Sequence, residues 1–318
     1  MALINGRKTY KPFSYGRAFD YWLQQQQAHW LATEVSLNSD LMDWKENLTE
    51  AEKSVIGGIL KGFTQSEIVV GDYWTNKVAK WFPHPEVVMA ATTMGAFESI
   101  HIHGYSLLDE SLGFQDYETY VEEPTIKAKL ERLVNTSGET KEDIARSLAI
   151  FSAFMEGVSL FSSFAVLMSF SRYNKLKGVA QIVSWSVRDE ALHSEFGCWL
   201  FKQFIAENSE IWTDEFKKTI YQAARDTVEL EDNFIDMVFS KGDVEGLTAY
   251  DLKQFIRNRA NVKLGDLGLK QNWKNIDKDA LKRMEWFDYL SAGVRHDDFF
   301  AVKVADYSKS LTFDDDMF

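Results

Sequence analysis

Two Glu-x-x-His motifs constrain the fold of this 318-residue chain more than any other feature; they run from Glu98 to His101 and from Glu190 to His193. Positions i and i+3 of an α-helix lie on one face, so each motif presents a carboxylate and an imidazole to the same point. Each motif lies inside a long, largely apolar stretch with helical character. A single motif of this kind is more often a surface Glu–His pair, but two on separate apolar helices favour a shared metal centre.

Two further carboxylates stand alone on apolar helical stretches: Glu67 in KGFTQSEIVVG and Glu156 in SAFMEGVSLF. A carboxylate among uncharged residues is costly to bury unless it is paired, protonated or bound to a metal. Ferritin-like dimetal proteins take one Glu from each of two helices and one Glu-x-x-His motif from each of two others. The sequence therefore predicts an all-α fold, a ferritin-like dimetal-carboxylate helical bundle with additional helices. Asp72, which follows Glu67 closely, competes with it for the first ligand position.

The predicted donor set is four carboxylates and two imidazoles, which suits iron or manganese and matches poorly the thiolate-rich or single-ion sites of zinc and copper. Cys198 is the one cysteine, so the chain can form no disulfide within itself and no thiolate cluster. If the protein takes part in dithiol chemistry, the thiols must come from a partner.

The charge and the first residues of the chain restrict its partners and location. A net charge of −13 argues against binding to nucleic acid, which needs clustered Lys and Arg to neutralise phosphates. It also argues against adsorption to anionic membranes. The N-terminal sequence has no apolar core followed by a small-residue cleavage site, so we expect a cytoplasmic protein.

The residue pattern predicts a mainly helical chain with only four prolines. We expect a helix from Tyr15 into the thirties, and a second helix that Thr49 caps and that stops before Pro83. The other expected helices cover 86–112, the region after Pro124, 141–172, a stretch through the 200s, 213–239, 248–264 and 277–289. Without a repeat or a Gly/Ser-rich linker, we expect a single domain over 1–293 and a flexible acidic tail over 294–318.

The stretch 147–171 is long enough to cross a membrane, and Glu156 is its only charged residue. Several serines and a glycine dilute its hydrophobicity, and the chain has no second comparable stretch. A buried central helix of a large bundle therefore fits better than a membrane span.

Two residues beside the motifs have open roles. Tyr105 follows Glu98 by seven residues, so its ring should share the ligand face, either as a core residue or as a donor that the metals oxidise. Asp189 could pair with Arg188 at the surface or accept a hydrogen bond from a ligand histidine. His103 faces away from the ligand side of its helix, and we do not expect it to bind metal.

With these motifs, the chain resembles the small, radical-generating (β) subunit of class I ribonucleotide reductase over nearly its whole length. The strings that carry the resemblance are LKGFTQSE, FESIHIHGY, MEGVSLFSSF, VRDEALH and the acidic tail ending in Phe. The family reduces ribonucleotides to deoxyribonucleotides, and the substrate and reducing cysteines belong to the large (α) subunit. The resemblance implies a homodimer whose tail docks on the large subunit through FDDDMF.

The resemblance also assigns roles to residues of this chain. Tyr105 falls where the family keeps its radical-forming tyrosine, Trp30 matches the tryptophan that feeds electrons towards the site, and Asp189 matches the carboxylate that links this tryptophan to a ligand histidine. Tyr307 matches the tail tyrosine that relays the radical to the large subunit. The metal ligands implied in this way are Glu67, Glu98, His101, Glu156, Glu190 and His193.

One position departs from the usual family pattern. Glu67 stands where the family usually has Asp, and Glu appears there in subclasses that keep the oxidising equivalent on a manganese–iron or dimanganese centre. The manganese–iron subclass typically replaces the radical tyrosine with Phe, whereas this chain keeps Tyr105. The combination favours two manganese ions activated by superoxide without a flavoprotein. The alternatives are a manganese–iron centre and a diiron or dimanganese centre with a tyrosyl radical, and O2 is the alternative oxidant.

Three other functions share such a site. A ligand-binding dimetal oxidase or monooxygenase would keep the ligands but has no use for the Phe-tipped tail. An acyl desaturase would need a channel for a long chain and a surface for a carrier protein, and the sequence indicates neither. A ferritin-like metal storage protein is usually built from a much shorter chain.

Overall fold

A computed structural model describes the chain except for residues 1, 115–116, 135–137 and 292–318. The described residues form a helical bundle, and their one strand-like pairing is an isolated bridge between Val244 and Leu247. The all-α prediction is confirmed. The α-helices are α1 (Gly16–Gln27), α2 (Asn38–Met42), α3 (Glu50–Asp72), α4 (Ala79–Trp81), α5 (Pro85–Leu112), α6 (Tyr117–Val121), α7 (Pro124–Val134), α8 (Lys141–Ala149), α9 (Phe161–Ser169), α10 (Lys177–Glu207), α11 (Asp214–Val238) and α12 (Ala249–Asp266).

Several shorter elements interrupt or extend these helices. Residues 278–291 are also helical. The π-helical segments are η2 (Asp43–Asn47), η3 (Tyr73–Val78) and η4 (Ile150–Ser159), and the 3₁₀ segments are η1 (Ala32–Glu34), η5 (Phe170–Tyr173) and η6 (Ser209–Ile211).

The predicted cap of α3 is confirmed. The Thr49 hydroxyl accepts a hydrogen bond from the Glu52 backbone N–H, and the Glu52 carboxylate accepts one from the Thr49 N–H. This capping box satisfies two N–H groups that a helix start otherwise leaves unpaired, and it contributes about 1 kcal/mol.

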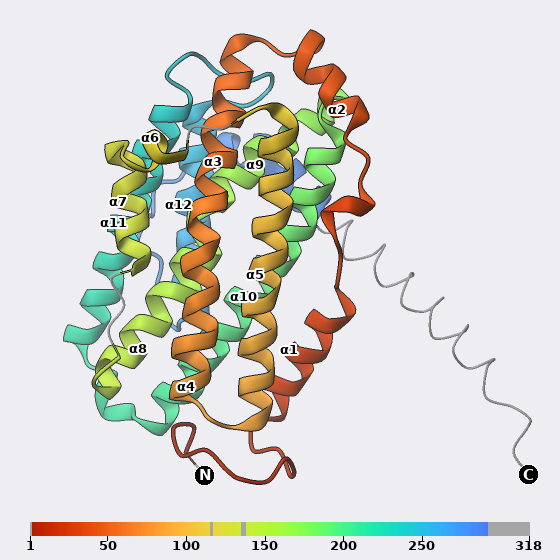
Figure 1. Cartoon of the computed structure of the whole chain (residues 1–318). Helices are drawn as coiled ribbons and strands as arrows, with labels where there is room; N and C mark the ends of the chain where they lie inside the picture. The colour runs from red at the N-terminus through yellow and green to blue at the C-terminus, as the bar shows by residue number, and fades with distance from the viewer. Residues whose placement is uncertain (1, 115–116, 135–137, 292–318) are drawn as a thin grey trace, which may run out of the picture.

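Helices α3 and α5 run side by side along the front of the bundle, with α1 against α5 and α10 behind them (Figure 1). Their contact is close because two glycines face each other across it. A Cβ atom on Gly95 would lie 2.5 Å from Thr75 Cγ2 and 3.1 Å from the Gly71 carbonyl oxygen. The close approach brings Glu67 of α3 near the Glu-x-x-His motif of α5.

Two sequence expectations need correction. Helix α1 ends at Gln27 rather than in the thirties, so Trp30 lies in the segment that follows it. The stretch 141–172 is not one continuous α-helix, because the π-helical segment η4 separates α8 from α9. Backbone carbonyls of η4 accept hydrogen bonds from residues of other helices, and local sequence periodicity does not show these partners.

The apolar stretch Lys141–Tyr173 lies in the centre of the bundle. It is the one stretch among the described residues that is long and apolar enough to cross a membrane, and 89% of its most apolar window is buried within the protein. This burial supports the prediction of a core helix over that of a membrane span.

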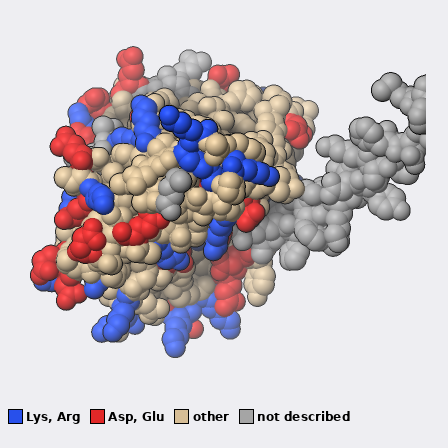
Figure 2. All heavy atoms as spheres, turned by 90° about the horizontal axis from the view of Figure 1, so that it is seen from below, with Lys and Arg blue, Asp and Glu red and all other residues tan. Residues whose placement is uncertain are grey.

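Figure 2 shows acidic side chains mainly towards the left of this face and a group of adjoining Lys and Arg side chains across its upper centre.

Candidate metal centre

The six predicted ligands meet in the core from four different elements. Glu67 comes from α3, Glu156 from η4, and the two Glu-x-x-His motifs from α5 and α10. Every one of these side chains is at most 1% exposed. They form two groups whose ligand atoms lie within 4.8 Å of one another; these are Glu67, Glu98, His101 and Glu190, and Glu98, Glu156, Glu190 and His193.

Two carboxylates, Glu98 and Glu190, belong to both groups. His101 Nδ1 lies 2.9 Å from Glu98 Oε2 and 3.0 Å from Glu190 Oε1. His193 Nδ1 lies 2.8 Å from Glu98 Oε1 and 3.5 Å from Glu190 Oε2. The arrangement is therefore that of two adjacent cation sites with two shared carboxylates between them.

The donor atoms fit divalent cations. Among the described residues, no hydrogen bond reaches either oxygen of Glu67, Oε2 of Glu156 or Nε2 of His193, although all are buried. Four buried carboxylates share this space with two histidines. The carboxylates repel one another, and two hard or borderline cations would relieve that repulsion.

Protonation takes up part of this charge in the absence of metal. Burial, together with the charges of Glu190 and Glu98, raises the pKa of Glu67 well above its ordinary value. Burial and the same two carboxylates raise the pKa of Glu156. Burial alone would lower the pKa of His193, but Glu98 and Glu190 outweigh it and raise this pKa to about 9. Bound metal ions would displace these protons.

Asp189 lies between Trp30 and His101. Its Oδ2 accepts hydrogen bonds from Trp30 Nε1 at 2.8 Å and from His101 Nε2 at 3.2 Å, while Gln25 donates to Oδ1 at 3.0 Å. Burial raises the pKa of Asp189, but His101 and Arg188 outweigh it and lower this pKa. Asp189 is thus ionised, and it orients His101 with Nδ1 towards the carboxylates. Of the two roles open for Asp189, the contact with a histidine is present, and Arg188 Nε also lies 3.4 Å from Oδ1.

Tyr105 is fully buried beside the cluster, as its spacing predicts. Its ring centre lies 6.3 Å from that of His101 and 4.7 Å from that of Phe63. Its hydroxyl has no hydrogen-bond partner among the described residues. Burial raises the pKa of Tyr105 well above its ordinary value, so the phenol is neutral.

Sequence analysis did not single out Trp74, which contacts a predicted ligand. Trp74 is buried, but its Nε1 also donates a 2.7 Å hydrogen bond to Glu156 Oε1. The sequence spacing could have indicated that Trp74 lies near the ligands, because Trp74 follows Glu67 by the same seven residues that separate Tyr105 from Glu98.

The competing residues lie elsewhere. Asp72 and His103 are exposed and belong to neither ligand group, whereas Glu67 is the α3 carboxylate that lies in one. Tyr307 and the tail 294–318 lie outside the described residues.

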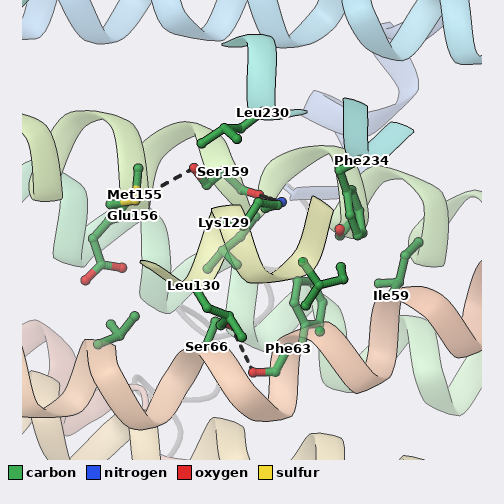
Figure 3. A pocket seen from close by; sticks show the side chains of 15 residues that line it. Ile59, Phe63, Ser66, Lys129, Leu130, Met155, Glu156, Ser159, Leu230 and Phe234 are labelled. Atoms are coloured by element: carbon green, nitrogen blue, oxygen red, sulfur yellow. Dashed lines mark hydrogen bonds between the residues drawn. The ribbon is translucent and has the colours of Figure 1, made fainter. Parts of the chain in front are cut away.

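A narrow apolar cavity reaches the cluster at Glu156 (Figure 3). It has an empty volume of about 700 Å³, which includes its open mouth, and lies between α3, α7, η4 and α11. Side chains such as Phe63, Leu130 and Phe234 line it, and Lys129 provides a charged group in its wall.

The fold and this donor set define a ferritin-like helical protein with a site suited to two metal ions. The family model described as "Ribonucleotide reductase, small chain" matches residues 7–279. A probable ribonucleoside-diphosphate reductase small subunit of Invertebrate iridescent virus 3 is 34% identical, and the match covers 98% of this chain and 87% of the relative. The ribonucleoside-diphosphate reductase subunit beta of Chlamydia pneumoniae is 28% identical, over 89% of this chain and 90% of the relative.

Solved structures share the fold. A ribonucleotide reductase R2 subunit from Clostridium botulinum superposes with a TM-score of 0.82 at 22% identity, covering 92% of this chain and 94% of that one. A dimanganese(II)-NrdF from Streptococcus sanguinis gives a TM-score of 0.74 at 20% identity, covering 87% and 99%. The chain belongs to the ribonucleotide reductase small-chain family. Its function is that of the small subunit of this oxidoreductase, which acts together with a large subunit.

Proposed function

We propose that the six-residue cluster holds the dimetal centre that supplies the radical equivalent for reduction of ribonucleoside diphosphates on the large subunit. The observation that carries this proposal is the buried pair of ligand groups, connected through His101 and Asp189 to Trp30. When bound, two redox-active metal ions would supply a stored one-electron oxidising equivalent. The residues of the chain fix the ligand geometry, exclude water and connect the site to the surface.

For the metals, we propose two manganese ions, with manganese–iron and two iron ions as the alternatives. Glu67 supports this choice because of its place in the family pattern, and one structural neighbour is named as a dimanganese protein. Tyr105 is then a bystander. An electron paramagnetic resonance spectrum of the oxidised protein tests this directly. A broad multiline signal with manganese hyperfine splitting is expected, and a narrow organic radical signal would return the radical to Tyr105.

We propose that Trp30, Asp189 and Tyr307 form the route by which the oxidising equivalent leaves. Asp189 accepts the Trp30 indole N–H, so it can hold or take the proton when Trp30 is oxidised. Ser291, the last described residue, lines the same surface hollow as Arg188, the neighbour of Asp189 in sequence, which supports a route on this side of the bundle. A Tyr307→Phe variant should bind metal normally and support no turnover with the large subunit. Full turnover would refute the relay.

The apolar cavity is our proposed path for the oxidant. Its apolar side chains suit uncharged O2, and Lys129 in its wall supplies a positive charge for superoxide, the oxidant that we expect for two manganese ions. Loading the protein with metal and exposing it either to O2 with superoxide dismutase or to a superoxide source distinguishes the two. Activation that dismutase abolishes would support superoxide, and activation that survives dismutase would support O2.

For partners and location, we propose docking of the tail 294–318 on the large subunit, a homodimer, and a cytoplasmic protein. The outward face of α3 and α5 supports the dimer, because Ile68 of α3 is 58% exposed and the small residues Ala96 and Ser99 of α5 are exposed as well. Deletion of 294–318 should abolish binding of the large subunit while metal content stays the same. Retained binding would show that the tail is not the docking segment. If the protein is instead an oxidase or a storage protein, its activity would survive the deletion.

A further inference from the structure

The segment that carries Glu156 is held by side chains from outside its own helix. Three backbone carbonyls of η4 accept hydrogen bonds from residues of other helices. The donors are Ser194 Oγ to Ser152 at 2.6 Å, Arg259 Nε to Gly157 at 3.1 Å and Lys129 Nζ to Ser159 at 3.3 Å.

The carbonyl of Ser159 needs an external donor because the helix changes type at this point. In a π-helix the carbonyl of residue i accepts from the N–H of residue i+5. The Phe164 N–H, which this pattern would give to Ser159, instead donates to Leu160 at 3.0 Å. Lys129 beside Ser159 supplies the replacement (Figure 3). A buried carbonyl without any partner would be costly, so the donor favours the π-helical register.

Arg259 acts next to the ligand itself, because Gly157 follows Glu156 in the chain. Helices α12 and α10 pack so tightly here that a Cβ atom on Gly157 would lie 2.7 Å from Lys263 Cε of α12 and 2.9 Å from Ser194 Oγ of α10. The Arg259 guanidinium carbon also lies 3.3 Å from the ring centre of Phe161. The guanidinium is thus fixed by an aromatic face and a backbone carbonyl at once.

Lys129 is fixed in a comparable way from the other side. Its Nζ lies 2.5 Å from Glu231 Oε1, and Glu231 is fully buried. Ser162, three residues after the end of η4, donates to Glu231 Oε2 at 2.7 Å. This network ties α7 and α11 to both sides of the junction between η4 and α9.

We propose that Arg259 and Lys129 are positioning residues that hold η4 in its π-helical register and thereby aim Glu156 at the second ligand group. A shift of one residue turns a helical side chain by about 100° about the helix axis. Return of η4 to an α-helical register would therefore turn Glu156 away from Glu190 and His193. The inference rests on the proposed dimetal centre, and it adds residues that touch neither ligand group.

The test is a titration of metal-free protein with Mn²⁺, with bound metal counted by elemental analysis. The wild type should bind two ions. Arg259→Met removes the donor and keeps an apolar stem on Phe161, and it should weaken one site at least tenfold while the other stays within twofold. Arg259→Lys can still donate to Gly157 and should restore most of the loss. The matched control is Arg257→Met, since Arg257 on the same helix bonds Asp232 and the Lys253 carbonyl.

A second variant approaches the segment from the other side. Lys129→Met combined with Glu231→Gln removes the donor without leaving a buried unpaired carboxylate, and it should weaken the same site. It keeps the inference testable if Arg259→Met fails to fold. Amide hydrogen exchange of 150–164 in the metal-free protein should become faster in both variants and stay unchanged in Arg257→Met.

A comparison with Glu156→Ala decides whether these residues act through the ligand. If they do, adding Arg259→Met to Glu156→Ala should cause no further loss of metal affinity. Equal weakening of both sites, unchanged binding, or full additivity with Glu156→Ala would overturn the inference. A wild-type protein that binds fewer than two ions would instead refute the proposed dimetal centre, so the two failures are distinct.

Discussion

Replacing Asp189 with Asn should show how far the orientation of His101 depends on its hydrogen bond to Asp189 and how far it depends on the packing around it. Each oxygen of Asp189 is approached by donors, Oδ2 by Trp30 and His101 and Oδ1 by Gln25. An amide has one oxygen and one NH₂ group, so at least one buried donor loses its acceptor in either orientation. Each such loss costs about 1–3 kcal/mol. The free energy of unfolding of the metal-free protein should fall by about 2 kcal/mol, and the Tm by about 3 °C for a chain of this length.

The same substitution should weaken metal binding. An NH₂ group facing His101 Nε2 would favour the tautomer with the proton on Nδ1, the nitrogen that faces Glu98 and Glu190. Loss of the partner behind a ligand histidine typically lowers metal affinity by about 10–100-fold. Calorimetric titration with Mn²⁺ and thermal unfolding measure the two effects. Glu195→Gln on the exposed face of the same helix is the control and should change neither. Wild-type Mn²⁺ affinity in Asp189→Asn would refute the role of this hydrogen bond.

Three shorter predictions follow from burial and close contacts. Gly197→Ala would place a methyl group onto the Ser152 side chain and should destabilise the fold by about 1–3 kcal/mol. Gly265→Ala has no atom within 4 Å of the added methyl group and should stabilise the fold by about 0.5–1 kcal/mol. Chemical denaturation measures both effects. The pKa of His193 is raised to about 9, so protonated His193 should contribute its full share to the free energy of unfolding of the metal-free protein below about pH 6.5. This contribution should be lost as the pH rises through about 9. The Mn²⁺ affinity should rise over the same pH range, because the imidazole is then free to bind metal. Glu156→Ala should bind one Mn²⁺ instead of two, and unchanged metal content would remove Glu156 from the ligand set.

The ligand cluster could be predicted from sequence because its information is local. A spacing of three residues places Glu and His on one helix face, and a lone acid such as Glu156 is conspicuous in an apolar stretch. The same reasoning placed Tyr105 beside the site. It also separated His103, which points away on the same helix.

What could not be predicted depends on residues that are distant in sequence. The π-helical register of η4 is satisfied by Lys129 and Arg259, and Arg259 lies about one hundred positions from Gly157. No Gly or Pro follows Gln27 closely, so the sequence does not mark the end of α1. The residue periodicity therefore predicted a helix that is too long. The hydrogen bond of Trp74 to Glu156 depends on the packing of η3 against η4, which are distant in sequence.

Repulsion between the buried carboxylates disfavours the cluster when metal is absent, so the packing of the bundle must stabilise the fold around it. Aromatic rings pack around it. The ring centres of Tyr73 and Phe151 are stacked 3.6 Å apart, and those of Trp74 and Phe196 lie 5.7 Å apart. Protons on Glu67, Glu156 and His193 reduce the repulsion between carboxylates when metal is absent. Two divalent ions would replace these protons and bind the folded state alone, so metal should raise the free energy of unfolding as its concentration exceeds its Kd. The framework around the cluster therefore sets the ligand positions before metal arrives, and metal binding adds stability to a geometry that packing and the external donors to η4 already hold.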